Sequence, residues 1–291
     1  MEGLKINKKA SKKLAHLQII TDYIEIVALG LKPAYLVDNC SVSVDDVVSL
    51  VEKSNLKPLQ KCRVLVVDMD IFVVGMDDIK EKIRKLSTFD WLCHPFLLSI
   101  GVSDISIVEQ TDLQQITTIL QETIMSAVFA SENILVSLHV TNELVSVVSL
   151  PFIAGWLLGY PCIYRADTAG ALALSGIPLI KVSIPITRRS SPSPTSSSNT
   201  SSSYAAGTMN IMEFTVPQSM LLASNELTRV LFQDRIDTMA KNLTSAISRL
   251  ISEQEFTFRE MSPQAQYWKE CFPNQIINPE IEILSSSHVI L

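Results

Sequence analysis

The chain has 291 residues, of which 47% are hydrophobic and 19% are charged, so it is long and apolar enough to bury a sizeable core and is not a disordered chain. Its 24 basic residues are outnumbered by 30 acidic residues, and the formal net charge of −6 supplies no overall field that would attract a phosphate backbone. We therefore expect no nucleic acid among its partners, and we expect one α/β domain over residues 1–291.

The first half of the chain alternates short apolar runs typical of strands with segments of helical periodicity. Strands are predicted at Ala34–Val37 and Val64–Val67, and helices at 14–31, Val44–Glu52 and Asp78–Leu86. Ser43 and Asp77 directly precede the second and third of these helices, so we expect each to be an N-cap. Such an alternation favours an open, mostly parallel sheet flanked by helices.

The middle of the chain adds a strand at Ser99–Ser103 and a helix that Thr111 and Gln114 open as a capping box. An apolar stripe supports this helix, formed by Leu113, Ile116, Leu120, Ile124 and Val128.

An uncharged segment from Leu144 to Tyr164 is long enough to cross a bilayer. Prolines and glycines that would break or weaken one long helix interrupt it. They are Pro151, Gly155, Gly159 and Pro161. We expect no membrane span here, but a strand over Leu144–Ser149, a helix over Phe152–Leu158 and a strand beginning at Pro161.

Two late strands are predicted at Pro178–Ile186 and Ile211–Val216. Nine of the fourteen residues from Ser190 to Ser203, between these strands, are serines, and apolar side chains there are too few to offset the entropy of ordering. We expect a disordered Ser-rich loop over 188–208 within the domain, with serines accessible to kinases. Pro217–Ile251 predicts a long C-terminal helix, and we expect the tail over Phe256–Pro279 to be irregular.

The five cysteines lie far apart, and no two of them form a C-x-x-C pair. They are Cys40, Cys62, Cys93, Cys162 and Cys271. This pattern is typical of a reducing compartment. Asp22 and Glu25 interrupt the apolar stretch that follows the N-terminal lysines, so the start of the chain lacks the pattern of a cleavable signal. We expect a soluble cytoplasmic or nuclear protein, not a secreted one.

Aspartates follow several of the predicted strands, namely Asp38, Asp68, Asp70, Asp104 and Asp167. In an open parallel sheet ligands bind beyond the carboxyl ends of the strands, so these carboxylates would gather at one edge, where oxygen ligands suit Mg²⁺. Asp38, Asp68 and Asp70 are therefore our candidate catalytic and metal-binding residues. The alternative role of such aspartates is to cap turns and helices.

The sequence Asp68-Met69-Asp70 after an apolar strand resembles the first motif of haloacid-dehalogenase-type phosphatases. In that family the first Asp attacks phosphorus, the second handles the leaving-group proton, and Mg²⁺ neutralises charge. The chain departs from the pattern at Phe72, where the family has a small polar or β-branched residue. It contains no P-loop, G-x-G-x-x-G, G-x-S-x-G, H-E-x-x-H or EF-hand pattern.

Three short segments resemble a family of animal proteins whose human member is called chromosome one open reading frame seventy-four. They are Leu31–Asp38 (LKPAYLVD), Leu157–Pro161 (LLGYP) and Ser175–Leu179 (SGIPL). The resemblance spans most of the chain apart from the Ser-rich loop. It implies a domain of unknown function, and it supplies no catalytic residues.

Two functions of different classes therefore remain open. The first is a non-catalytic adaptor that binds a protein partner through an apolar surface and the Ser-rich loop. The second is a Mg²⁺-assisted hydrolase or transferase that acts on a small phosphate- or carboxylate-bearing substrate through Asp38, Asp68 and Asp70. We favour the adaptor, because no catalytic signature is complete.

Overall fold

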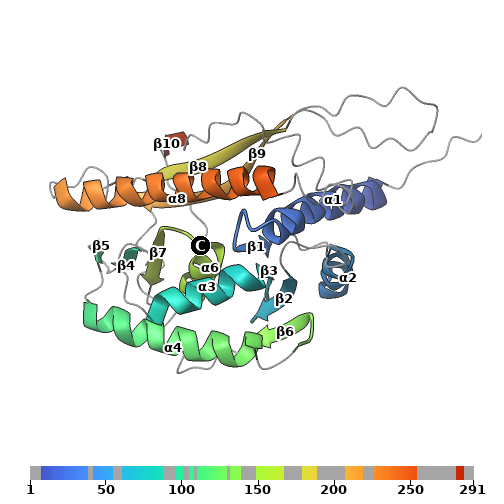
Figure 1. Ribbon diagram of the computed structural model, residues 1–291, viewed down its shortest axis with the longest axis horizontal. Coiled ribbons are helices and arrows are strands. Elements are labelled where there is room, and N and C mark those ends of the chain that lie inside the picture. The colour runs from blue at the N-terminus through green and yellow to red at the C-terminus, as the bar shows by residue number, and fades with distance from the viewer. Residues whose placement is uncertain are drawn as a thin grey trace, which may run out of the picture. The chain divides into compact units, whose positions relative to one another are not determined.

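The computed structural model describes twelve stretches of the chain (Figure 1). These stretches are residues 8–38, 42–54, 61–87, 96–100, 105–107, 110–129, 132–138, 149–166, 179–188, 207–218, 226–253 and 280–284. The chain divides into two compact units, one formed by residues 1–175 with 289–291 and the other by residues 176–288.

The first unit is built around a four-stranded sheet, sheet A, with strand order β1-β3-β2-β6. Strands β1 (Ala34–Val37) and β2 (Cys62–Val67) both pair antiparallel with β3 (Asp70–Gly75). Strand β6 (Leu135–Leu138) runs parallel to β2. Strand β3 lies between two other strands, and its apolar run from Phe72 to Val74 is buried in the cores on the two faces of the sheet.

Helices cover both faces of sheet A. On one face, α1 (Lys8–Ala28) and α2 (Val44–Ser54) pack their apolar stripes against a core that includes Val73. On the other face, α3 (Met76–Ser87), α4 (Gln110–Phe129) and α6 (Leu150–Leu158) enclose a core that includes Phe72. The alternation of side chains along β3 therefore divides the first unit into three layers.

A second, smaller sheet of the first unit, sheet B, has strand order β5-β4-β7. Strand β4 (Phe96–Ile100) is antiparallel to β5 (Ile105–Ile107) and parallel to β7 (Cys162–Ala166). A sharp turn at Gly159, where φ is 77°, ends α6 and lets the chain return as β7.

The second unit contains an antiparallel sheet, sheet C, with order β10-β8-β9. Its strands are β8 (Leu179–Arg188), β9 (Gly207–Pro217) and β10 (Glu280–Leu284). The unit also contains the longest helix, α8 (Glu226–Glu253), which has one buried face. That face is formed by Phe232, Ile236, Ala240, Leu243 and Ile247.

The expectation of a mostly parallel sheet is wrong, because only β2–β6 and β4–β7 are parallel among the seven strand pairs of the described residues. The error arises at Asp68 and Met69. These two residues form a hairpin loop that returns the chain directly into β3, where the sequence analysis placed no strand. The chain therefore pairs two consecutive strands antiparallel before the next helix begins.

Most of the other predicted elements are present with shifts at their ends, the largest at the C-terminal helix, which begins at Glu226 and not at Pro217. They are α1, α2, α3, α4, α6, α8, β1, β2, β7, β8 and β9. Asp77 lies inside the first turn of α3 and not before it, so it does not hold the predicted cap position. The predicted strand over 144–149 lies outside the described residues apart from Ser149, and so do the Ser-rich residues 189–206 and the tail over 256–279. Among the helices described, none is long and apolar enough to cross a membrane.

Candidate functional site

The three candidate aspartates lie at one end of sheet A. Asp38 directly follows β1, Asp68 lies in the β2–β3 loop, and Asp70 is the first residue of β3. The register places them together, because Val37 pairs with Ile71 and Val67 pairs with Asp70. All three side chains are exposed. We call Asp38, Asp68, Met69 and Asp70 the aspartate tip; the catalytic and metal-binding roles of its carboxylates stay predictions.

Two features mark the loop of the aspartate tip. Asp68 has a φ of 54°, and it is the only non-glycine residue with a positive φ among those described. The side chain of Met69 is 89% exposed, which makes it the most exposed large apolar side chain of the described residues. A glycine or asparagine would adopt the left-handed conformation at lower cost, and a polar side chain would suit the position of Met69.

The three aspartates share one end of the sheet, and their metal-binding role stays a prediction. Within the described residues, no group of three or more His, Cys, Asp and Glu side chains is arranged to hold a metal ion. Asp104 and Asp167, the other strand-end aspartates of the sequence, lie outside that part of the chain.

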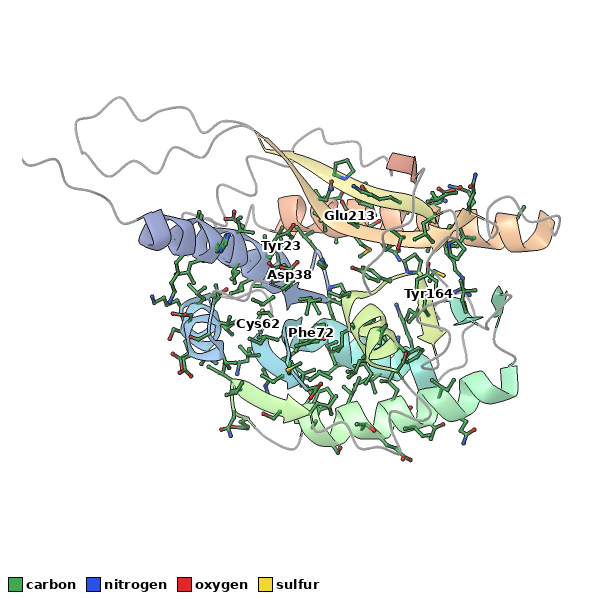
Figure 2. All side chains as sticks on the ribbon, turned by 180° about the vertical axis from the view of Figure 1, so that it is seen from behind. Tyr23, Asp38, Cys62, Phe72, Tyr164 and Glu213 are labelled. Atoms are coloured by element: carbon green, nitrogen blue, oxygen red, sulfur yellow. The ribbon has the colours of Figure 1, made fainter. Side chains whose placement is uncertain are left out.

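A pair of stacked tyrosines lies beside Asp38, between α1 and β1. The rings of Tyr23 and Tyr35 have centroids 4.3 Å apart and are inclined by 5° (Figure 2). Burial, and then the negative charge of Asp38, raise the pKa of the Tyr35 hydroxyl, so this group stays protonated at any physiological pH. The ammonium of Lys32 lies 5.6 Å from the centroid of the Tyr23 ring.

Two cations that sequence analysis did not single out bind the carboxyl ends of helices in the first unit. Lys82 Nζ donates hydrogen bonds to the carbonyls of Trp156 and Leu157 at the end of α6, and it lies 4.8 Å from the centroid of the Trp156 ring. Arg63 donates to the carbonyl of Val128 near the end of α4. Neither helix has a basic residue of its own in its last turn, so these side chains supply the charge that the helix dipole favours there.

The environment of Lys82 changes its acidity. Burial lowers the pKa of this amine to about 7, although the nearby carboxylate of Asp78 opposes the change. The residues around Lys82 in the sequence did not indicate a lowered pKa, because a lysine four residues after an aspartate on a helix usually forms an exposed ion pair.

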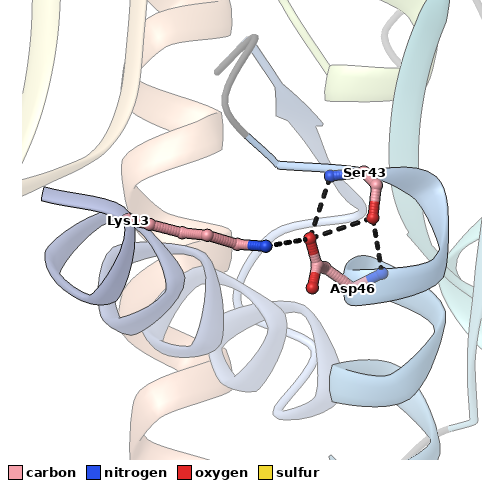
Figure 3. A network of polar contacts seen from close by, with 3 residues as sticks. All are labelled: Lys13, Ser43 and Asp46. Atoms are coloured by element: carbon pink, nitrogen blue, oxygen red, sulfur yellow. Dashed lines mark hydrogen bonds and ion pairs between the residues drawn. The ribbon is translucent and has the colours of Figure 1, made fainter. Parts of the chain in front are cut away.

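A polar network fixes the start of α2 (Figure 3). The backbone N–H of Asp46 donates to Ser43 Oγ, and Ser43 donates back to the Asp46 carboxylate, which confirms the predicted cap. Lys13 of α1 forms an ion pair with the same carboxylate at 2.9 Å. The hydrogen bond from Lys13, together with those from Ser43, lowers the pKa of Asp46 to about 2.

The two cysteines with described side chains, Cys62 and Cys162, are buried and are not joined in a disulfide. Burial, and then the negative charge of Asp78, raise the pKa of Cys62 to about 12, so this thiol is not an activated nucleophile.

In the second unit, Glu213 of β9 accepts hydrogen bonds from Asn210 and Ser183 and forms an ion pair with Lys181 at 3.3 Å. This cluster ties β8 to β9.

Comparison with known proteins identifies the family but assigns no activity. Residues 3–231, more than three quarters of the chain, match the family model described as Domain of unknown function (DUF4504). No curated protein and no solved structure gave a significant match. The chain therefore belongs to the DUF4504 family.

Proposed function

We propose that the protein is a non-catalytic binding or adaptor protein and that the aspartate tip is part of its contact surface. The observation that carries this proposal is the loop itself, in which Asp68 has a positive φ and Met69 is almost fully exposed. A large apolar side chain at a loop tip contributes no burial to the fold itself, and loops held by a rigid sheet commonly carry binding residues.

The chemistry of the aspartate tip indicates the kind of partner. Met69 is a flexible apolar side chain that adapts to shallow pockets; Asp68 and Asp70 precede and follow it in the chain, and Asp38 lies at the same end of sheet A. A fitting partner is a protein with a small apolar pocket bordered by Lys or Arg. The carboxylates would accelerate encounter and set the orientation of the complex, while Met69 would contribute the buried area.

The Ser-rich loop is the second part of the proposal. It joins β8 to β9, which pair with each other up to Arg188 and Gly207. Phosphorylation of its serines would add negative charge and so tune a partner contact. Deletion of 188–208 is expected to weaken recovery of the partner protein.

The proposal also includes a cytoplasmic or nuclear location and the narrower likeness to the chromosome one open reading frame seventy-four proteins.

Site-specific photo-crosslinking tests the role of the aspartate tip. A photoreactive residue replaces Met69 in one protein and Lys80, an exposed residue of α3, in a control protein. We expect a defined protein adduct from position 69 that is absent from position 80 and that weakens when Asp68 is changed to Asn. Identical adducts at both positions, or none at position 69, would contradict the proposal.

The alternative function is a Mg²⁺-assisted hydrolase or transferase. The observation that favours it is the register of sheet A, which brings Asp38, Asp68 and Asp70 to one end of the sheet. It requires that the three carboxylates move together around a cation and a phosphate- or carboxylate-bearing substrate. Turnover that is abolished by Asp38→Asn and by Asp68→Asn in folded protein would establish this alternative.

A further inference from the structure

Lys32 differs from the two half-buried cations at the helix ends of the first unit, Lys82 and Arg63. It lies in the turn between α1 and β1, and its side chain is only 8% exposed. Its described contact is with the ring of Tyr23. Within the described part of the chain, its ammonium forms no hydrogen bond or ion pair with an oxygen atom.

Lys82 and Arg63 differ from Lys32 in their hydrogen-bond partners, and both stabilise the fold. Lys82 donates to two carbonyls at the end of α6, and Arg63 donates to a carbonyl near the end of α4. Both therefore satisfy backbone oxygens that the helix ends leave open. Among the described residues Lys32 has no such oxygen, although only 8% of its surface is exposed.

A buried ammonium without an oxygen partner is costly, because it loses its hydration and gains little in return. The face of one tyrosine ring offsets only part of that loss. Burial accordingly lowers the pKa of Lys32 to about 8, yet at pH 7 most molecules still carry the charge. An anion that reached this ammonium would therefore be bound in a poorly hydrated site, where its attraction is stronger than at the surface.

The surroundings of Lys32 suit an entering group. Lys32 keeps 8% of its surface exposed, so it is not fully enclosed. Tyr23 and Tyr35, stacked at 4.3 Å, form a rigid aromatic wall beside it. The wall is fixed because Tyr23 belongs to α1 and Tyr35 to β1.

We propose that Lys32 anchors a binding site for the phosphate or carboxylate group of a small ligand, with the ring of Tyr23 as its wall. The site does not depend on the aspartate tip, so either proposal can fail without the other. The bound ligand supplies the oxygen acceptors that Lys32 lacks among the described residues. Loss of the Lys32 ammonium therefore abolishes binding of the ligand.

Thermal unfolding of the full chain tests the site with defined probes. Inorganic phosphate and succinate are compared with sodium chloride at equal ionic strength, for the wild type, Lys32→Met and Lys32→Arg. We expect one of the two anions to raise the Tm of the wild type by about 5 °C at a hundredfold excess over its Kd. The rise should be lost in Lys32→Met and partly kept in Lys32→Arg. The anion that acts distinguishes a phosphate ligand from a carboxylate ligand.

Lys80→Met is the matched control, because Lys80 is an exposed lysine of the same unit. It should keep the full Tm response. NMR of the Lys32 side chain in the wild-type protein gives a second readout that does not depend on the folding of a variant. The active anion should perturb the Lys32 signals and raise the pKa of Lys32. A response that persists in Lys32→Met, or Lys32 signals that neither anion perturbs, would overturn the proposal. A poly-glutamate peptide that perturbs those signals when the small anions do not would also overturn it.

Discussion

Lys82 and Trp156 join α3 to the end of α6, because Lys82 Nζ donates to the Trp156 carbonyl and lies 4.8 Å from the centroid of its ring. The same lysine thus satisfies a helix end and contacts an aromatic side chain, at the cost of its own hydration. Its pKa falls to about 7, and this makes the stability of the first unit dependent on pH.

The sign of that dependence follows from the proton balance. Between pH 7 and the ordinary lysine value of 10.5, the unfolded chain holds a proton on Lys82 that the folded chain has released. The free energy of unfolding should therefore rise with pH over this range, by up to about 1.4 kcal/mol per pH unit, relative to a Lys82→Met variant. Urea unfolding between pH 7 and pH 9.5 measures it. Lys80→Met should show the wild-type slope, and parallel profiles for wild type and Lys82→Met would refute the assignment.

Substitutions at Asp68 should rank by their tolerance of a positive φ. We expect the free energy of unfolding of Asp68→Asn and Asp68→Gly to equal or exceed that of the wild type, by at most about 1 kcal/mol. Asp68→Val should lower it by about 1–2 kcal/mol, because a β-branched side chain is strained at a φ of 54°. Chemical denaturation of the three variants gives the ranking. A valine variant as stable as the wild type would show that the loop does not hold this conformation.

Two glycines of the α6 region offer a matched pair. A Cβ at Gly159 would lie 2.9 Å from Pro33 Cγ, and φ there is 77°. Gly159→Ala should therefore lower the free energy of unfolding by about 1–3 kcal/mol. A Cβ at Gly155 would lie 3.2 Å from Ile163 Cγ2, within a regular helix. The gain in helix propensity there offsets the tight contact, so Gly155→Ala should change stability by less than about 1 kcal/mol. Equal losses in the two variants would contradict this reading of the turn.

The Asp46 carboxylate should titrate far below an ordinary aspartate. Its pKa of about 2 depends first on the hydrogen bond from Lys13 and then on those from Ser43. The stabilisation that it provides is complete above the ordinary value of 3.8 and is lost as pH falls towards 2. NMR titration of the carboxyl group should show an increase in its pKa in Lys13→Met and in Ser43→Ala. Lys53→Met, at the far end of α2, should leave it unchanged, and a value near 4 in the wild type would rule out the network.

Local patterns predicted the helices better than the sheets. The stripe through Ile116, Leu120 and Ile124 is buried along α4, and the cap of α2 at Ser43 is present, because both depend on residues close in sequence. The strand β3 was missed because its position depends on a reversal of the chain that the residues close in sequence do not indicate. Its loop lacks the Asn-Gly or Asp-Gly pair that usually signals a tight hairpin, so nothing near Asp68 indicated that the chain reverses.

The candidate site was predictable only in part. The sequence placed Asp38, Asp68 and Asp70 after apolar runs, and the structure puts them at one end of sheet A, although by antiparallel pairing with β3 and not by a parallel sheet. Lys32 and Lys82 gave no signal, because the surroundings of a lysine depend on tertiary packing, such as the contact of Lys82 with Trp156. Burial of a single lysine follows from tertiary packing, which periodicity does not encode.

The most direct test of the central claim, that the aspartate tip serves binding and not metal chemistry, is thermal unfolding with and without Mg²⁺ or Mn²⁺. The wild type and an Asp38→Asn/Asp68→Asn double variant are compared at equal ionic strength. A cation that bound only the folded protein would stabilise it by about 2.7 kcal/mol at a hundredfold excess over Kd. We predict the same response to the metal in both proteins. A metal-dependent increase in Tm that is present in the wild type and lost in the double variant would contradict the account and establish the Mg²⁺-assisted alternative.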